Sequence, residues 1–127
     1  MGQVNIFSSF KLLSYNERIN NLCGKVHLSE LKNIFATGEL FIGCDSGPMH
    51  IASLVGIPIV ALMGPQSPQL FGPWGKQQRK IIYKNYYCSP CWQFSCLHTK
   101  SGAGACIMDI QPKEVFDEAI SILTKDI

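Results

Sequence analysis

Two short apolar runs, joined by a turn and one helix, constrain the fold of this chain more than any other feature. The runs are residues 40–44 and residues 57–63, and neither alternates with polar positions. Uninterrupted apolar strands of this length are typical of parallel sheets that are covered on both faces. Between the runs, Pro48 suits the first turn of a helix and Gly56 suits its end. The stretch therefore predicts a βαβ unit, and with it an α/β fold built on a Rossmann-like open parallel sheet.

The sequence on either side predicts further elements of the same kind. Apolar positions at helical spacing indicate a helix over residues 28–35, and residues 80–83 are consistent with another strand. Residues 64–75 are rich in Gly and Pro and are expected to form a long loop. Pro112 opens a last helix with a broad apolar face, which consists of Val115, Phe116, Ala119, Ile120, Ile122 and Leu123.

Length and composition exclude several classes of protein. The 127 residues suit one domain, which we place at residues 16–127, after a poorly determined N-terminal segment over residues 1–15. Lys and Arg number 11 against 9 Asp and Glu, and they are scattered, which argues against a nucleic-acid partner. No apolar run approaches the roughly 18 residues of a membrane-spanning helix, and the N-terminus has no signal-peptide pattern. We therefore expect a cytoplasmic protein.

The turn between the first strand and its helix carries the strongest functional signal. Asp45, Ser46 and Gly47 occupy it, and His50 follows about one turn into the helix. Backbone N–H groups and the helix dipole favour an anion here, at the edge where open parallel sheets bind ligands. Gly47 would let a diphosphate approach the backbone, and Ser46 and His50 would add hydrogen bonds. Asp45 would accept from a sugar hydroxyl or cap the helix. The alternative is an ordinary helix cap followed by a surface histidine.

Four of the six cysteines lie in one Cys-rich loop, residues 86–108. Four thiolates at this spacing predict a closed tetrahedral zinc site of the structural type, with the ligands Cys88, Cys91, Cys96 and Cys106. His98 is an alternative fourth ligand, and thiols without metal and disulfides are the other two readings. Nearby aromatic residues are expected to shield a small core of the loop itself; they are Trp74, Tyr86, Tyr87, Trp92 and Phe94. Cys44, at the end of a predicted buried strand, is expected to be a small apolar filler.

The turn and its helix read Asp45-Ser46-Gly47-Pro48-Met49-His50-Ile51-Ala52, and Gly56-Ile57-Pro58 and Ala61-Leu62-Met63-Gly64-Pro65 follow. Further pieces in the same order are Leu22-Cys23-Gly24-Lys25, Phe71-Gly72-Pro73-Trp74-Gly75, Cys88-Ser89-Pro90-Cys91 and Ile110-Gln111-Pro112. Together they resemble glycosyltransferase family 9, the ADP-heptose:lipopolysaccharide heptosyltransferases. Gln66 departs from the family pattern, which usually has threonine at this position.

The resemblance implies a fold and a reaction. Family 9 has the GT-B architecture of two Rossmann-like domains, and this chain matches the C-terminal, nucleotide-sugar-binding half. The diphosphate and sugar of an ADP-heptose-like donor would be held by Asp45, Ser46, Gly47 and His50. The nucleoside would lie beside Lys25 and Val26. No metal ion or other cofactor is required for catalysis in the family.

The resemblance also implies what these residues do not supply. The acceptor, a lipopolysaccharide core, and the catalytic base would belong to an N-terminal domain that is missing here, so the isolated chain is expected to be inactive. The implied location is the cytoplasm, with peripheral association at the inner membrane. Two alternatives from other classes stay open: a non-catalytic, metal-stabilised binding module derived from this domain, and another nucleotide-sugar enzyme of the GT-B fold.

Overall fold

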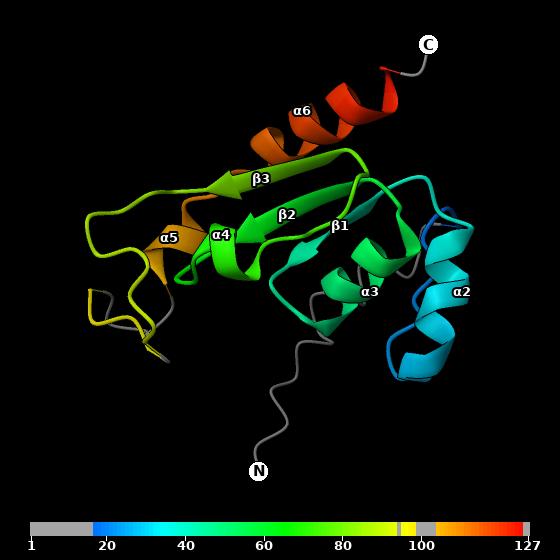
Figure 1. The fold of residues 1–127 in the computed structure, drawn as a ribbon, viewed down its shortest axis with the longest axis horizontal. Coiled ribbons are helices and arrows are strands. Elements are labelled where there is room, and N and C mark those ends of the chain that lie inside the picture. Colours follow the sequence, from blue (N-terminus) through cyan, green and yellow to red (C-terminus); the bar gives the residue numbers. More distant parts are fainter. Residues whose placement is uncertain (1–16, 94, 99–103, 126–127) are drawn as a thin grey trace.

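The computed structural model describes residues 17–93, 95–98 and 104–125, which form a three-stranded parallel sheet with helices on both faces (Figure 1). The strands are β1 (Phe41–Cys44), β2 (Ile59–Met63) and β3 (Arg79–Tyr83), and β2 lies in the middle. Both pairings are parallel, so the predicted open parallel sheet and all three predicted strands are confirmed. The segment predicted to be poorly determined, residues 1–15, lies outside the described residues.

The helix α3 (Gly47–Val55) covers one face of the sheet, and its ends follow the prediction. Pro48 stands in its first turn, and Gly56 ends it in the left-handed region with a φ of 84°. Glycine is favoured there because other side chains clash with their own backbone in that conformation. The core on this face packs α3 against β2 and consists of Met49, Ala52, Ile57, Ile59 and Ala61, with Phe35 and Phe41 at its border.

The helix α6 (Pro112–Leu123) covers the opposite face, and it begins at the predicted proline. The carboxylate of Glu114 accepts the Gln111 N–H at 2.8 Å, which satisfies one donor at the helix start. The core on this side consists of Val60, Ile82, Ala119 and Ile122, with Leu40, Leu62, Ile110 and Val115 packed against it. Successive side chains of β2 therefore enter different cores, as the pleat of a strand requires.

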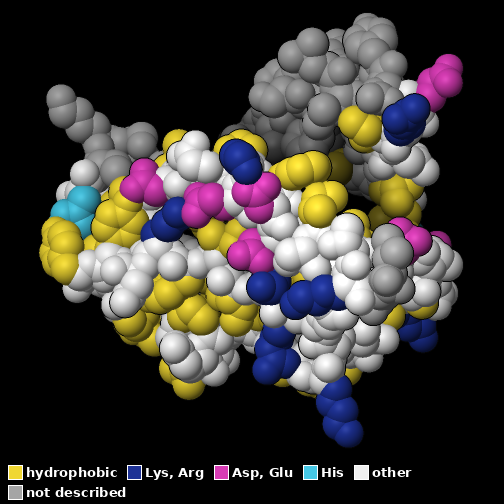
Figure 2. Space-filling model, turned by 90° about the horizontal axis from the view of Figure 1, so that it is seen from above, with side chains coloured by type: hydrophobic (Ala, Val, Ile, Leu, Met, Phe, Trp, Pro, Cys, Tyr) yellow, Lys and Arg dark blue, Asp and Glu magenta, His cyan; other side chains and the backbone are white. Residues whose placement is uncertain are grey.

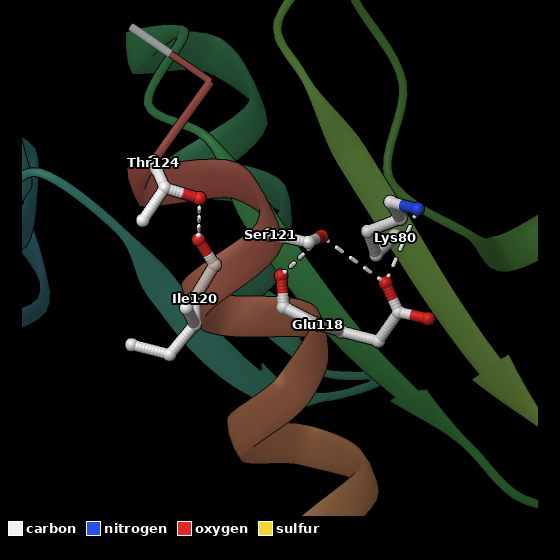
Figure 3. Close-up of polar contacts among 5 residues, drawn as sticks. All are labelled: Lys80, Glu118, Ile120, Ser121 and Thr124. Atoms are coloured by element: carbon white, nitrogen blue, oxygen red, sulfur yellow. Dashed lines mark hydrogen bonds and ion pairs between the residues drawn. The ribbon is translucent and has the colours of Figure 1, made fainter. Parts of the chain in front are cut away.

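Two ion pairs join α6 to β3 and to the residue that follows it. Lys80 lies 3.1 Å from Glu118 (Figure 3), and Lys84 lies 2.5 Å from Glu114. The hydrogen bond from Lys84, followed by the one from the Gln111 backbone, lowers the pKa of Glu114 below its ordinary value. All four side chains are about one-third exposed, so solvent screens these pairs. They orient α6, and apolar burial supplies most of its attachment.

One face of β1 differs from the prediction, because the described residues cover it only in part. Ile42 is 47% exposed and Cys44 is exposed as well, whereas Phe41 borders the α3 core. Among the described elements, α6 packs mainly on β2 and β3 and so does not extend over this side of β1. The expected cover on both faces is right for β2 and wrong for β1. The expectation that Cys44 is a buried apolar filler is wrong for the same reason.

Short helical turns replace parts of the stretches that were predicted to be irregular. The turn α4 (Pro68–Phe71) lies within the predicted loop at residues 64–75, and α5 (Ala105–Met108) carries Cys106. The helix predicted at residues 28–35 is present as a 3-10 turn, η2 (Leu28–Glu30), that continues into α2 (Leu31–Ala36). Neither piece has a buried residue, because α2 packs at the outer side of α3.

Only part of the predicted apolar face of α6 is buried against the sheet. Ala119 and Ile122 are buried, whereas Phe116, Ile120 and Leu123 are 63%, 40% and 39% exposed. Figure 2 looks onto this side of the molecule and shows acidic and basic side chains interspersed over it. Within the part of the chain that the structure describes, no helix has the length and apolar character needed to cross a membrane.

Replacing Ile122 with alanine should lower the free energy of unfolding by about 2–4 kcal/mol, because a fully packed side chain would leave a cavity. Phe116 on the same helix is 63% exposed, so the matched Phe116→Ala variant should lose no more than about 0.5 kcal/mol. Urea unfolding followed by circular dichroism measures both values. Equal losses in the two variants would contradict the docking of α6 through Ile122.

Candidate functional site

The β1–α3 turn (residues 45–50) lies where the first strand gives way to its helix. Cys44 at the end of β1 is paired with Leu62 near the end of β2, so the segments that follow the two strands leave the sheet at the same edge. In Figure 1 the arrowheads of all three strands point toward this edge, where the Cys-rich loop also lies. Ligands of open parallel sheets bind at the carboxyl ends of the strands. The geometry therefore agrees with the predicted position of an anion site.

The first turn of α3 has no capping side chain. Ser46 is the N-cap residue by its extended backbone, but its hydroxyl donates to the Cys44 carbonyl at 3.1 Å instead of accepting from the helix. The His50 N–H donates to the Ser46 carbonyl at 3.4 Å, and Pro48 has no N–H. Of the remaining first-turn donors, the N–H of Gly47 belongs to an exposed residue, whereas Met49 is fully buried, so the set that a ligand could reach is narrower than the sequence predicted.

Space in front of this turn is open. A Cβ built on Gly47 would meet no atom of the described residues within 4 Å, and both Ser46 and Gly47 are exposed. Together with the partial positive charge of a nine-residue helix, uncapped donors and open space are what an anionic group requires. The backbone at Ser46 and Gly47 is therefore accessible to an anionic group.

Asp45 and His50 face each other across the turn. The Asp45 Oδ1 atom lies 3.7 Å from the His50 Nε2 atom, and the two side chains are 25% and 39% exposed. Asp45 makes no capping bond to α3, so that part of its predicted role is wrong. Its carboxylate is placed to orient the imidazole, which lies on the first turn of α3 and can donate to a ligand at the same place. The four predicted residues of this turn are thus brought together by the structure.

The loop after β2 adds a residue that sequence reasoning did not assign to the site. The Oε1 atom of Gln66 is buried and has no hydrogen-bond partner within the described part of the chain. A buried acceptor without a partner is costly, by about 1–3 kcal/mol, so such atoms commonly mark the place of a donor from outside the chain. The sign of such a role in the sequence was the position of Gln66, directly after the Gly64-Pro65 pair that follows the second strand.

The two residues predicted beside the nucleoside lie in another segment. Lys25 is exposed and its N–H donates to the Leu22 carbonyl at 3.1 Å, while Val26 is half-buried. They stand just before η2 and α2, and α2 packs on α3. Figure 1 shows the first turns of α2 and α3 directed toward the same side of the molecule. The assignment of Lys25 and Val26 to a nucleoside stays a prediction.

The four clustered cysteines line one cavity of about 380 Å³ at the end of the molecule that holds the Cys-rich loop. Within the described ranges, no three His, Cys, Asp or Glu side chains are positioned to hold a metal ion together. Burial, as the largest cause, raises the pKa of the Cys106 thiol, and the nearby Cys91 and Cys96 raise it further. The zinc site expected from Cys88, Cys91, Cys96 and Cys106 stays a prediction.

The aromatic residues that were expected to shield a core of this loop differ in position: Tyr86 and Tyr87 line the cavity, and most of the others are exposed. Tyr87, Trp74 and Trp92 are 86%, 51% and 50% exposed, and Phe94 lies outside the described residues. The rings of Trp92 and Phe71 meet edge to face with their centroids 5.5 Å apart, and those of Tyr87 and His98 do so at 5.4 Å. Four of the rings in this region thus pack in two pairs near the surface, Phe71 with Trp92 and Tyr87 with His98.

Comparison with known proteins gives one consistent result. The family described as Glycosyltransferase family 9 (heptosyltransferase) matches residues 10–101. Lipooligosaccharide heptosyltransferase 2 of Campylobacter jejuni is 35% identical over 115 residues, which are 89% of this chain and 35% of that protein. Lipopolysaccharide heptosyltransferase 2 of Salmonella typhimurium is 30% identical over 107 residues, which are 84% and 29% of the two chains.

A solved structure agrees with these sequence matches. The structure of Escherichia coli ADP-heptose lps heptosyltransferase II aligns with a TM-score of 0.71 and 25% identity, over 98% of this chain and 35% of that one. The chain thus spans about a third of the length of the relatives that it matches.

Replacing Ser46 with alanine should change the free energy of unfolding by less than about 0.5 kcal/mol, because the exposed hydroxyl does not cap α3. A serine that caps a helix typically contributes about 1 kcal/mol. Urea unfolding of the wild type and the Ser46→Ala variant makes the comparison. A loss of 1 kcal/mol or more would show that the hydroxyl caps the helix in solution, and that the donors of the first turn are already occupied.

Proposed function

Because the chain belongs to glycosyltransferase family 9, we propose that its β1–α3 turn binds the diphosphate of a nucleotide-sugar donor. The observation that carries the proposal is the uncapped first turn of α3, with open space in front of Gly47 and the Asp45–His50 pair beside it. This arrangement offers backbone donors, a helix dipole and one imidazole to a single anion. An ADP-heptose-like donor is the ligand class that agrees with the names of the relatives.

Each residue of the turn has a distinct proposed task. The N–H group of the exposed Gly47 donates to a diphosphate oxygen, and the Ser46 hydroxyl can turn from the Cys44 carbonyl to do the same. His50 donates from its imidazole, held in place by the Asp45 carboxylate 3.7 Å away. When the bond between the anomeric carbon and the diphosphate breaks, negative charge grows on the leaving group. Fixed donors aimed at that charge lower the barrier of the step.

The reaction that we propose for the whole protein is transfer of a heptose, or a related sugar, to a lipopolysaccharide-type acceptor. An acceptor hydroxyl attacks the anomeric carbon as the diphosphate leaves, and a base takes up the hydroxyl proton. The turn described above supplies the donor side of this step. We assign the base and the acceptor surface to parts of the relatives beyond the third that this chain spans. The place of action is the cytoplasm, at the surface of the inner membrane, where a nucleotide sugar and a lipid-linked acceptor can meet.

Gln66 is a second donor-side contact in this proposal. Its buried Oε1 atom has no partner among the described residues and lies in the loop that leaves the sheet beside the β1–α3 turn. A hydroxyl of the donor sugar or ribose would satisfy this acceptor. The amide would then contribute to recognition, in the place where the family usually has threonine.

Titration of the chain with ADP should shift the backbone amide resonances of residues 46–50 before those elsewhere. His50→Ala should weaken ADP binding by about 10- to 100-fold, because a hydrogen bond to a charged group is lost. The matched control is His98→Ala, which removes an exposed histidine that contacts Tyr87 edge to face in the Cys-rich loop and should leave the affinity unchanged. Saturating ADP that leaves the β1–α3 turn unmoved would show that the site is elsewhere.

The 127-residue chain alone should bind the donor nucleotide weakly and transfer no measurable sugar. A single wall of a binding cleft leaves much of the bound nucleotide in solvent, which weakens binding. In this proposal the base, and the second wall that keeps water from the reacting carbon, belong to another part of the protein. The assay is consumption of a nucleotide-heptose donor in the presence of a lipopolysaccharide-core acceptor. It is repeated with the remaining part of a full-length relative added as a separate chain. Turnover by the isolated chain at an ordinary enzymatic rate would refute the assignment of the base to another part.

A further inference from the structure

Acidic residues are unevenly distributed along this chain. All nine Asp and Glu lie outside residues 46–108, although that stretch holds five of the eleven Lys and Arg. Two of its lysines pair with glutamates of α6, whereas Lys76 and Arg79 are exposed and have no acidic partner within the described ranges. The segment that joins β2 to β3 therefore carries positive charge that no neighbouring carboxylate neutralises.

This segment runs along one face of the sheet. Figure 1 shows it leaving the end of β2, passing through α4 and returning to the start of β3. A Cβ built on Gly72, just after α4, would lie 3.3 Å from the Cδ1 atom of Ile81 in β3, so the two segments are in contact. Ile81 points away from α6, because its neighbour Ile82 enters the core beneath that helix. The end of α4 thus lies on the face of the sheet opposite α6.

Large apolar side chains are exposed together on this segment and beside it. Leu70 and Phe71 end α4, and the Phe71 ring meets that of Trp92 edge to face. Ile81 lies next to the end of α4, and Trp74 follows that end closely in the sequence. We call these five side chains the α4 patch; they are between 38% and 71% exposed. Apolar side chains that are exposed as a group mark a surface that contacts a partner.

The two basic side chains lie beside the α4 patch. Arg79 is two residues from Ile81 on β3, so both side chains point to the same face of the sheet. The Arg79 guanidinium donates to the carbonyl of Gly75, which stands between Trp74 and Lys76 in the sequence. This bond holds both charges close to the tryptophan. In Figure 2, basic and hydrophobic side chains share the lower margin of the view, and no acidic side chain is visible among them.

Tryptophan beside lysine and arginine is the combination that proteins place at the surface of a lipid bilayer. The indole ring is amphipathic and lies at the level of the headgroups, and anionic headgroups attract Lys and Arg. A contact with another protein fits less well, because lysine is depleted in protein interfaces. The charge and the aromatic character of this surface therefore favour a lipid partner.

We propose that the α4 patch, together with Lys76 and Arg79, docks on a membrane surface that contains anionic lipids. The inference rests on the proposed function in one respect, namely that the acceptor is linked to a lipid. α4 follows β2 at the same edge of the sheet as the β1–α3 turn. Docking through the α4 patch therefore holds the donor side of the reaction close to the membrane in which the acceptor is anchored.

The first test measures binding of the 127-residue chain to phosphatidylcholine vesicles with and without phosphatidylglycerol. The chain should co-sediment with the anionic vesicles and much less with the neutral ones. Raising the salt from about 0.1 M to about 1 M should release it, since the Debye length falls from about 10 Å to about 3 Å. Trp74 and Trp92 are the two tryptophans of the chain, so brominated acyl chains in the vesicles should quench its fluorescence.

The second test removes the two charges. The double variant Lys76→Ala/Arg79→Ala should lower the affinity for the anionic vesicles by about 10- to 30-fold. The matched control Lys113→Ala/Lys125→Ala removes the same net charge at the two ends of α6, on the opposite face of the sheet. It should change the affinity by less than about 3-fold, because charges beyond a Debye length are screened.

The third test removes apolar side chains. Trp74→Ala and Leu70→Ser should each lower the affinity for the anionic vesicles by about 10-fold, since each side chain inserts among the headgroups. The matched control is Phe116→Ala, which removes a 63% exposed ring on α6 and should leave the affinity unchanged. Circular dichroism checks that each variant is folded. Leu70 is 71% exposed, so its replacement tests the α4 patch even if Trp74→Ala disturbs the turn.

Three results would overturn the proposal. The first is equal binding to neutral and anionic vesicles, or binding to neither, and the second is an equal loss in the control variants. The third is occupation of the α4 patch by protein: self-association that Leu70→Ser abolishes, or loss of vesicle binding when the remaining part of a full-length relative is added as a separate chain. The titration with ADP follows residues 46–50 and needs no membrane, so the lipid proposal and the donor-site proposal can fail independently.

Discussion

Burial of β2 on both faces is the constraint on which the rest of this structure depends. Ile59, Val60 and Ala61 are all 0% exposed, although neighbouring side chains of a strand point in opposite directions. Two separate layers are therefore needed to cover five residues. α3 supplies one and α6 the other, and β1 and β3 take the two sides of β2 in parallel. Parallel pairing requires crossover connections, which puts every strand end at one edge of the sheet.

The candidate site is a consequence of that arrangement. When β1 stops, the chain has to reverse into α3, and the start of a helix always presents N–H groups without intrahelical acceptors. In most helices a side chain caps them, but here the Ser46 hydroxyl turns back to the Cys44 carbonyl. The loop after β2 leaves beside this turn and brings the buried Gln66 Oε1 atom to the same edge. An uncapped helix start and an acceptor without a partner among the described residues therefore follow neighbouring parallel strands at the same edge of the sheet.

Away from β2 the packing becomes less complete, and each departure from the expected burial is found there. Ile42 and Cys44 lie on the open face of β1, and Phe116 lies on the part of α6 that overhangs the sheet. The cavity in the Cys-rich loop is at the opposite margin, beyond the end of β3. At β1 and α6 the opposing layer covers only part of the apolar surface. An apolar residue in the sequence therefore does not by itself show that the position is buried, because neighbouring elements cover these residues only in part.

The sequence by itself determined the α/β class, the three strands, the ends of α3 and the start of α6. These depend on local rules, such as apolar runs of strand length, a proline in a first turn and a glycine that accepts a positive φ at residue 56. It also pointed to the β1–α3 turn as a candidate anion site, because a strand, a glycine turn and a helix in succession present N–H groups at one place. Only the tertiary structure decided that Cys44 is exposed, that the Ser46 hydroxyl leaves the helix uncapped, that the Oε1 atom of Gln66 is buried, and that four cysteines line one cavity. Those properties depend on which segments, distant in sequence, lie on either side of a residue, and no local pattern carries that information.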